Sequence, residues 1–485
     1  MHKLRCLEIL SLPRYFFDIT GTVWHLKRAS HFSGIQRTVV MLVEKTAQRV
    51  GSENVYLSYF DKSRQKYCTF PYGFLKEEEL TDSNALRRQL GFRPIKKNRH
   101  PILRNYHGRR IKLYFHMVLA WLNALFHNDR FFHKRNTTRA EWIEFHSQER
   151  RSGVSLQTSS FENLAHAGDH LVLLDGTFTV SGAVDSFRKA KLRGLLVHTM
   201  VHDLIPITAP EFVPQLNQLT FHEWLLTSKT YTTQYLTNSE ATRRDLDYFF
   251  SVYGIERPVN VIRLAQARLP APTQHSTGPL LQNVNLSAYP GLTGGSLDSR
   301  IQAITSYPFV LCVGTIEIRK NVWRLATVWD RLRKKEGISL PKLVFAGKSG
   351  WMKQDFDALL QATGNIFGWV EVVECPTDAE LATLYRKCQF LVMPSLYEGW
   401  GLPVGEALSY GKTAVVSGTS SLPEVGEDLV EYCDPVSIDS IMEACLRLID
   451  NPTYRAHLEQ RIKETHLRGW EDVASDLVAA IHGVK

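Results

Sequence analysis

The 485-residue sequence has no apolar run that approaches the roughly 20 residues needed to span a bilayer. Its first residues carry Lys3 and Arg5 together with Glu8 and lack a long apolar core, so we predict no signal peptide there. The seven cysteines form no CxxC pair and have no regular spacing. Several lie inside apolar runs, so we expect buried free thiols and a reducing, cytoplasmic compartment.

The composition is that of a globular protein, with 44% hydrophobic and 22% charged residues, and the length suits about two or three domains. In the C-terminal half, short apolar runs alternate with amphipathic segments, which predicts an α/β domain with a doubly wound parallel sheet. The predicted strands are Phe309–Val313, Lys342–Ala346, Val370–Glu374, Phe390–Met393, Thr413–Ser417 and Val430–Cys433, and the predicted helices are Asn321–Lys335, Asp355–Ala362, Asp378–Lys387, Leu402–Tyr410 and Ile438–Ile449. Such a domain binds its ligand beyond the C-terminal ends of the strands.

The N-terminal half begins in the same way, with a predicted strand at Tyr15–Ile19 and a helix after Ser33-Gly34. Further strands are predicted at Leu171–Leu174 and Leu195–Val201. Residues 77–160 fit this pattern poorly and indicate an insertion, whereas residues 270–299 are rich in Pro, Gly and Ser and indicate a linker. The predicted organisation is an N-terminal Rossmann-like domain over residues 1–275, a linker over 276–300, a second Rossmann-like domain over 301–468 and a final segment over 469–485.

Basic residues are concentrated in one segment of this chain, whose net charge is +9. Residues 93–135 hold eleven Lys or Arg and one acid, Asp129, around the aromatic-rich stretch Ile111–Phe126. A basic helix of this kind can lie at an anionic membrane surface. It can equally pack on the core with a solvated basic edge. Nucleic acid is a third alternative, but no nucleic-acid-binding motif accompanies the charge.

The most informative stretch is Pro394–Leu408, which follows an apolar strand and ends in the start of a helix. Gly399 and Gly401 allow close approach of a ligand to the backbone, and a helix N-terminus offers free N–H donors to a phosphate. Glu398 and Glu406 provide acceptors for sugar and ribose hydroxyls. Phosphate donors beside hydroxyl acceptors predict a nucleotide-sugar site.

Other candidate site residues also lie where a strand ends or a helix begins. Arg319 and Lys320 sit between a strand and a helix, where two cations can stabilise the negative charge on a leaving diphosphate, unless they are an exposed basic pair. His202 follows the strand Leu195–Val201 and either faces a ligand or is a plain loop residue. Ser33 can cap the next helix, and Gly34 gives backbone access there.

Six segments carry a resemblance to glycosyltransferase family 4, whose members are retaining enzymes of the GT-B fold, with two Rossmann-like domains facing a cleft. The segments are Val313–Asn321, Glu398–Glu406, Ser420–Glu424, His202–Pro206, Ser33–Arg37 and Asn238–Leu246. The match covers nearly all of residues 300–475 and parts of the N-terminal half. In this fold, a last helix such as the one expected near Trp470–Val484 crosses back to the N-terminal domain.

The resemblance implies a role for each motif residue. Glu398 would face the donor sugar and Glu406 the ribose, and the amides around sugar and phosphate would be those of Gly399, Trp400, Gly401 and Leu402. Phe is commoner than Trp at position 400, which leaves the chemistry unchanged. Arg319 and Lys320 would stabilise the leaving phosphate and His202 would bond a donor hydroxyl, with Gly34 in a loop between acceptor and donor. Glu424 would lie near the site or cap a helix.

No metal or other cofactor is expected. His198 and His202 are four residues apart but fall on a strand and its loop, and Asp245-Leu-Asp247 has the letters of a DxD element inside a predicted helix. No carboxylate is obviously placed as a covalent nucleophile. The resemblance implies same-face attack, in which the leaving phosphate accepts the proton of the acceptor hydroxyl.

The sequence therefore predicts a retaining glycosyltransferase that moves a hexose, with GDP-mannose as the favoured donor, to a growing surface polysaccharide, either free or lipid-linked. Transfer of rhamnose or glucose from a dTDP- or UDP-sugar is the alternative. A GT-B epimerase or phosphorylase and a non-catalytic sugar-binding or scaffold protein are the rivals. Expected partners are the donor, a saccharide acceptor and, through residues 93–135, the inner face of the cytoplasmic membrane.

Overall fold

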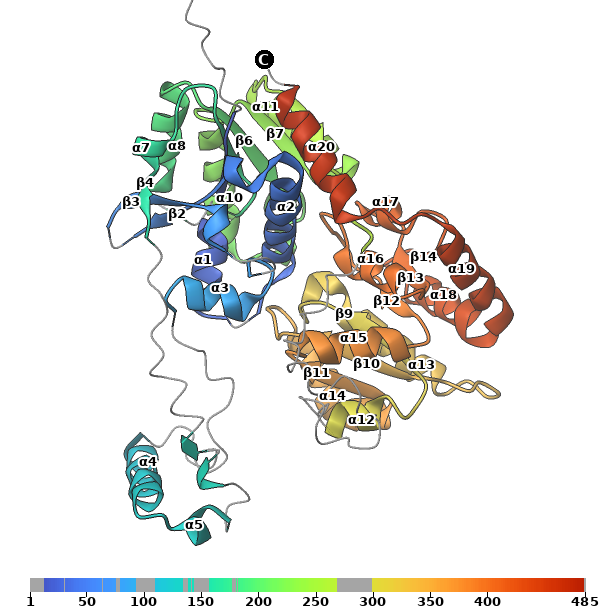
Figure 1. Ribbon diagram of the computed structural model, residues 1–485. Coiled ribbons are helices and arrows are strands. Elements are labelled where there is room, and N and C mark those ends of the chain that lie inside the picture. The colour runs from blue at the N-terminus through green and yellow to red at the C-terminus, as the bar shows by residue number, and fades with distance from the viewer. Residues whose placement is uncertain are drawn as a thin grey trace, which may run out of the picture. The chain divides into compact units, whose positions relative to one another are not determined.

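The computed structural model describes residues 13–29, 31–62, 64–75, 79–92, 110–133, 138–140, 142–143, 157–176, 180, 182–267 and 299–483 (Figure 1). They form two compact units, Met1–Leu195 and Leu196–Lys485. This division falls inside the segment 1–275, for which the sequence predicts one domain. The predicted linker lies almost wholly outside the described residues, so the predicted domain boundaries stay a prediction.

The first unit contains a mixed sheet in which β1 is central and pairs in parallel with both β2 and β5, while β3 pairs antiparallel with β2. Its strands are β1 (Tyr15–Asp18), β2 (Val55–Asp61), β3 (Lys66–Pro71), β4 (Ser159–Ser160) and β5 (His170–Leu173). Its helices are α1 (Thr20–Leu26), α2 (Gly34–Val50), α3 (Ser83–Gln89), α4 (Arg110–Leu125), α5 (Asp129–His133), α7 (Phe161–Leu164) and α8 (Ala183–Leu192), with 3-10 turns at Ser52–Asn54 and Tyr72–Phe74.

Helix α2 forms where the sequence predicts a helix after Ser33-Gly34. Ser33 is its N-cap residue, and the side-chain oxygen of Gln36 accepts a hydrogen bond from the Ser33 amide at 3.3 Å. Val39, Val40 and their apolar neighbours are buried, so this helix contributes to the core of the first unit. Ile35, which the pattern also assigns to the apolar face of the helix, is exposed in the first turn.

Helices α4 and α5 lie in the predicted insertion and have a small core of their own. Phe132 and Trp142 are fully buried against Ala120 and Ala124 of α4. Another face of α4 leaves six large apolar side chains exposed, and Phe126, directly after the helix, is exposed as well; the six are Tyr114, Phe115, Val118, Trp121, Leu122 and Leu125. Within the described ranges, no helix is both long and apolar enough to cross a membrane. Most basic residues of the 93–135 segment lie outside those ranges.

The second unit contains a six-stranded parallel sheet of order β11-β10-β9-β12-β13-β14 and a parallel group of order β6-β7-β8. Its strands are β6 (Leu196–Val201), β7 (Gln234–Thr237), β8 (Val259–Val261), β9 (Phe309–Val313), β10 (Lys342–Gly347), β11 (Val370–Glu374), β12 (Leu391–Met393), β13 (Ala414–Ser417) and β14 (Glu431–Cys433). Its helices are α9 (Ile205–Thr208), α10 (Gln215–Ser228), α11 (Glu240–Tyr253), α12 (Ser299–Ile304), α13 (Val322–Leu332), α14 (Gln354–Gly368), α15 (Asp378–Lys387), α16 (Leu402–Ser409), α17 (Leu422–Gly426), α18 (Ile438–Asp450), α19 (Pro452–Glu464) and α20 (Trp470–His482), with 3-10 turns η5 (Pro210–Phe212) and η8 (Ile318–Lys320).

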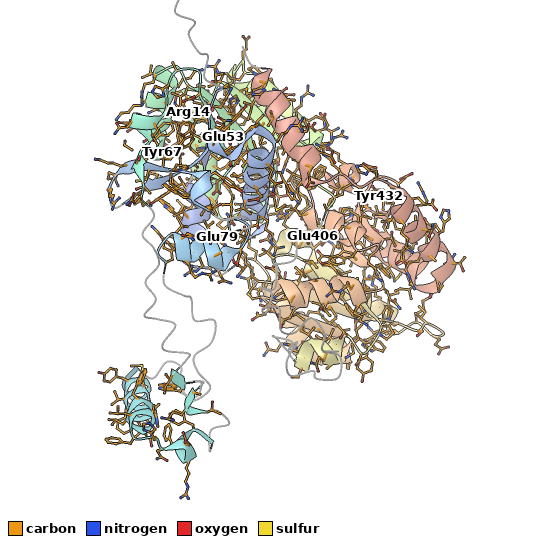
Figure 2. The ribbon with its side chains drawn as sticks, in the orientation of Figure 1. Arg14, Glu53, Tyr67, Glu79, Glu406 and Tyr432 are labelled. Carbon is orange, nitrogen blue, oxygen red and sulfur yellow. The ribbon has the colours of Figure 1, made fainter. Side chains whose placement is uncertain are left out.

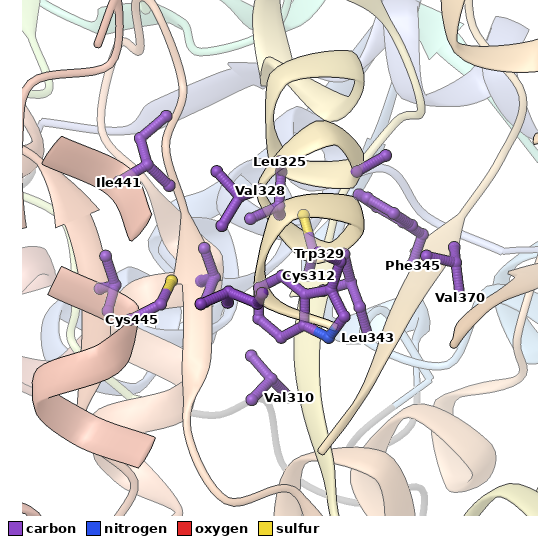
Figure 3. Close-up of a cluster of buried hydrophobic side chains, with 14 of the residues drawn as sticks. Val310, Cys312, Leu325, Val328, Trp329, Leu343, Phe345, Val370, Ile441 and Cys445 are labelled. Atoms are coloured by element: carbon purple, nitrogen blue, oxygen red, sulfur yellow. The ribbon is translucent and has the colours of Figure 1, made fainter. Parts of the chain in front are cut away.

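One face of the six-stranded sheet is covered by α13, α14 and α18. Figure 3 shows Trp329 of α13 at the centre of this core, with Leu343 of β10 and Cys445 of α18 around it. The Trp329 indole N–H donates to the Pro341 carbonyl at 2.9 Å, so its one polar group is satisfied in the apolar core. The α/β fold class predicted from the sequence is confirmed.

The last helix, α20, packs on the β6-β7-β8 group of the same unit (Figure 1). Gln234 of β7 donates from its side chain to the carbonyl of Ala480, with an N···O distance of 3.0 Å. The inward face of α20 is apolar and buried, and it includes Trp470, Leu477 and Ile481. The terminal helix is thus held by residues more than two hundred positions earlier in the chain.

Six cysteines lie within the described residues, and all six are free thiols. Five are buried, as expected from their apolar surroundings, and burial raises the pKa of the Cys312 thiol to about 12. Cys375 is exposed, which differs from the prediction. It directly follows β11, at the polar end of the sheet rather than inside an apolar run.

A buried acidic pair at the ends of β1 and β5 is not anticipated by the sequence analysis. Asp18 is fully buried, and its Oδ1 accepts hydrogen bonds from the hydroxyls of Tyr67, at 2.6 Å, and Thr20, at 2.5 Å. Tyr67 is labelled on β3 in Figure 2. The other oxygen, Oδ2, has no hydrogen-bond partner in the described part of the chain. Burial and, to a smaller extent, the charge of Asp175 raise the pKa of Asp18 to about 7, although the hydrogen bonds from both hydroxyls lower it.

We predict that Asp18→Asn weakens the pH dependence of stability. The native state holds the Asp18 proton more tightly than the unfolded chain, so stability falls as pH rises from about 4 to 7 and stays low above that range. A pKa shift of this size corresponds to a change on the order of 4 kcal/mol in the free energy of unfolding. The melting temperature of the wild type should therefore drop more between pH 5 and pH 8 than that of the variant.

Asp185→Asn is the matched control, because Asp185 is an exposed carboxylate of the same unit that pairs only with Arg188 at the surface. It should leave the pH dependence of the melting temperature unchanged. An Asp18→Asn protein with the same drop as the wild type would show that Asp18 stays ionised.

Candidate active site

The candidate site is built from loops that follow the C-terminal ends of β9 and β12. The loop after β9 runs through η8 into α13, and the loop after β12 runs from Pro394 to the start of α16. The Leu396 amide donates to the Arg319 carbonyl at 2.9 Å, and the Asn321 side chain donates to the Pro394 carbonyl at 2.9 Å. One backbone bond and one bond from the Asn321 side chain therefore hold the two loops together, apart from the charged side chains of the site.

A buried ion network joins these two loops. Glu398 is 7% exposed and accepts from both predicted cations: Lys320 Nζ lies 2.6 Å from Oε1, and Arg319 Nη1 lies 2.7 Å from Oε2. Arg319 also donates from Nη1 to the Tyr397 carbonyl at 2.7 Å. Its Nη2 lies 2.9 Å from Oε1 of Glu317, an almost fully buried carboxylate that the sequence analysis does not single out.

The network keeps its key groups ionised. Burial raises the pKa of Glu398, but Arg319 and Lys320 lower it more strongly, to about 2. Burial lowers the pKa of Arg319, and Glu398 and Glu317 outweigh this and raise it well above its usual range. At neutral pH the site therefore presents two cations and an ionised Glu398 side by side.

The Glu398–Trp400 turn is fixed by the Ser420-Ser421 segment. The Ser421 hydroxyl donates to the carbonyls of Glu398 and Trp400, both at 2.9 Å, and the Glu398 amide donates to the Ser420 hydroxyl at 3.0 Å. Trp400 is buried, and its indole N–H lies 3.4 Å from the Ala265 carbonyl. These bonds give the serines of the motif a direct structural role.

This turn requires glycine at two positions, one because of a close contact and the other because of its backbone angle. A Cβ atom at Gly399 would lie 2.2 Å from the His202 carbonyl oxygen and 3.0 Å from the Asp203 Cβ. Gly401 has φ of +115° and directly precedes Leu402 at the start of α16. The His202-Asp203 segment after β6 therefore lies directly against the Glu398 turn, within the second unit.

Glu406 lies on α16, the helix that follows the Glu398 turn (Figure 2). The Tyr385 hydroxyl donates to its Oε2 at 2.7 Å, and the Tyr385 ring stacks on Tyr410 with centroids 5.3 Å apart. The carboxylate is only partly buried, so it is oriented by Tyr385 while remaining accessible.

The structure brings Glu398, Arg319, Lys320 and the backbone of His202 together. Gly34 is the exposed first residue of α2 in the first unit, with Ser33 as its cap, so the capping interpretation of this segment accounts for its geometry. The functional roles assigned to all these residues stay predictions.

Glu424 and Asp245 have structural partners. The Glu424 carboxylate accepts from the backbone amides of Glu240 at 2.9 Å and Ala241 at 2.8 Å, so it caps α11, as the capping alternative predicts. Asp245 lies on α11, where its DxD letters fall on a helix, and it accepts from the Tyr397 hydroxyl. Within the described ranges, no group of three or more acidic, His or Cys side chains is arranged to hold a metal.

Comparisons with known proteins identify the class of enzyme and the fold. The family described as "Glycosyl transferases group 1" matches residues 297–465, which hold the whole six-stranded sheet and its ion network. This chain is a glycosyltransferase with the GT-B fold. The family match lies in the second unit, where the sequence motifs are densest.

Its relatives include the O-antigen chain mannosyltransferase B of Escherichia coli, 28% identical over 287 residues, which are 58% of this chain and 69% of that protein. The MMP alpha-(1->4)-mannosyltransferase of Mycolicibacterium hassiacum is 34% identical over 108 residues, 21% of this chain and 26% of that protein.

Solved structures show the same fold. Anabaena HepE, solved in complex with UDP and glucose, superposes with a TM-score of 0.53 at 11% identity, covering 97% of this glycosyltransferase and all of that chain. Sucrose-phosphate synthase from Thermosynechococcus elongatus superposes with a TM-score of 0.54 at 14% identity, covering 97% and 99%.

We predict that Gly399→Ala destabilises the second unit, because the new methyl group would overlap the His202 carbonyl, which is backbone and cannot move alone. Overpacking of this kind costs about 1–3 kcal/mol. The measurement is the melting temperature. Gly418→Ala is the matched control, since a Cβ there would lie 3.9 Å from its nearest neighbour, the Cys433 carbonyl oxygen. Equal melting temperatures for the two variants would mean that the His202 segment does not rest against this turn.

Proposed function

We propose that this glycosyltransferase moves mannose from GDP-mannose to a hydroxyl group of a growing surface polysaccharide, with retention of the anomeric configuration. The observation that carries the proposal is the Glu398 turn with Arg319 and Lys320 against it at the ends of parallel strands. The relatives named as mannosyltransferases, one of them of O-antigen chains, support the sugar and the type of product.

In the proposed reaction, Arg319 and Lys320 bind the diphosphate and stabilise the charge that builds up as it leaves. Both cations are held in place before the donor arrives, so they need no reorganisation during the reaction. They also supply the positive charge that a metal provides elsewhere, so we propose a metal-independent reaction.

The remaining site residues recognise hydroxyl groups and phosphate. Glu398 accepts from the donor sugar, Glu406 accepts from the ribose, and His202 hydrogen-bonds a sugar hydroxyl. The amides of Gly399, Trp400, Gly401 and Leu402 lie at the start of α16 and donate to sugar and phosphate oxygens. We propose same-face attack of the acceptor hydroxyl, with its proton passing to the leaving phosphate.

The test is a thermal-shift screen with GDP, UDP, dTDP and ADP and their common sugar conjugates. A ligand that binds only the native state raises the melting temperature. At a concentration of one hundred times its Kd, it adds about 2.7 kcal/mol to the free energy of unfolding. GDP-mannose and GDP should give the largest shift. The shift should be lost in Glu406→Ala and Arg319→Ala and kept in Glu443→Ala, a control that removes an exposed carboxylate of α18.

A shift with only UDP or dTDP conjugates would replace mannose by a glucosyl or rhamnosyl donor. Donor binding without transfer to any saccharide acceptor would favour the non-catalytic interpretation. No shift with any nucleotide would contradict the donor site itself.

We further propose that the acceptor is lipid-linked and that α4 holds the protein at the inner face of the cytoplasmic membrane. The exposed apolar side chains of α4 and Phe126 recur at three- and four-residue intervals, so they share one helical face, while Ala120 and Ala124 face the small core. Eleven basic residues surround this helix in the sequence, against one acid. An apolar face flanked by positive charge is complementary to an anionic lipid surface.

We predict that the protein sediments with anionic phospholipid vesicles at low salt. The double substitution Leu122→Ser and Leu125→Ser should reduce the bound fraction severalfold, because two exposed apolar side chains of the α4 face are lost, each worth about 2 kcal/mol when buried. Leu216→Ser, at a leucine of α10 that is more exposed than Leu122 and Leu125, is the control and should bind like the wild type. Failure of the wild type to bind would refute membrane contact through α4.

A further inference from the structure

The ion network of the site is electrically balanced in the structure. Two carboxylates, Glu317 and Glu398, face two cations, Arg319 and Lys320, and all three ion-pair contacts among the four are 2.9 Å or shorter. All four side chains are at most 16% exposed. A nucleotide-sugar diphosphate would add two negative charges to this network. In a poorly solvated site, such an excess of negative charge is costly.

A bound proton is the simplest way to remove part of that excess. Glu398 is a poor acceptor for it, because it touches both cations. Among the charged side chains of the described residues, Glu317 forms an ion pair with Arg319 alone, through Oε1, and its side chain is 3% exposed. When Arg319 also serves a phosphate, Glu317 loses part of its only direct counter-charge. Its own burial already raises its pKa above the usual range, although Arg319 and Lys320 pull it down.

The charged groups around Glu317 come from four loops. Arg319 and Lys320 lie on its own loop, and Glu398 comes from the loop after β12. On the loop after β10, Gly350 packs on Glu317, and Lys348 pairs through its backbone with Ile316. On the loop after β6, Asp203 interacts with Arg319 and Glu398, and its pKa is also raised by burial, against the opposing effect of Arg319. Asp203 is therefore the rival site for a proton.

We propose that Glu317 takes up a proton when the donor diphosphate binds to Arg319 and Lys320. The proposal rests on the proposed function, because it requires a diphosphate at these two cations. Protonated Glu317 keeps an acceptor oxygen for the guanidinium, so it continues to position Arg319 while its charge no longer opposes the phosphate. Glu317 is thereby a positioning residue that couples donor affinity to pH.

The test is isothermal titration calorimetry of the full chain with GDP-mannose, in two buffers of different ionisation enthalpy, between pH 6.5 and 8.5. UDP-glucose and dTDP-rhamnose are titrated in parallel, because the diphosphate is common to all three. The difference in heat between the buffers counts the protons taken up. We expect net uptake of up to about one proton per donor, and a Kd that weakens by up to about tenfold per pH unit on the alkaline side.

Glu317→Gln should abolish the uptake and flatten the pH dependence of Kd, while still binding the donor, because the glutamine oxygen can accept from Arg319. Asp203→Asn should leave the uptake intact. Donor binding without proton uptake, or uptake that survives Glu317→Gln and disappears in Asp203→Asn, would overturn the proposal while leaving the donor site standing. If none of the three donors bound, the proposed function and this inference would fall together.

Discussion

The pairing of Glu398 with Arg319 and Lys320 is the interaction on which the site depends. Glu398 follows the end of β12 and the two cations follow the end of β9, and each side would be left with buried, unpaired charge without the other. The pairing therefore holds two loops of the sheet together and also sets the charge that a ligand meets. In the proposed reaction, structural and functional demands therefore coincide at Glu398.

Hydrogen bonds from outside the sheet extend this constraint. Ser421 holds both ends of the Glu398–Trp400 turn, and Glu424, four residues on from Ser420, caps α11. Thr242 of α11 in turn approaches the carbonyls of His202 and Gly399, both at 3.4 Å. The short segment Ser420–Glu424 thus links the Glu398–Trp400 turn to α11, which gives this motif a structural role.

Much of the second unit could be predicted from sequence because its strands are short apolar runs with polar residues at their ends. Strand β9 and helix α15 have the predicted bounds, since Phe309–Val313 is buried throughout and Thr377 caps the helix with Glu380. Helix α19 escaped prediction because only Leu458 and Ile462 of it are buried, which leaves no apolar stripe to detect. Glu398 and Glu406 stood out because they lie in the stretch Pro394–Leu408, between an apolar strand and the start of a helix. Glu317 and Asp18 did not, because a carboxylate that is buried beside a partner far along the chain looks like any surface acid in the sequence.

The base and the sugar of the donor could not be predicted from the sequence for another reason. Carboxylates and backbone amides recognise hydroxyls and phosphates that all nucleotide sugars share.

The bond between Gln234 and Ala480 has a consequence for how the protein is made. The two residues are 246 positions apart, and the inward face of α20 is apolar, so the surface that α20 covers on the β6-β7-β8 group stays uncovered until α20 has been synthesised. At ribosomal rates of about 5–20 residues per second, that interval lasts roughly 12 to 50 seconds. During this time the nascent chain carries an exposed apolar surface, which makes it a client for chaperones that bind such surfaces at the ribosome.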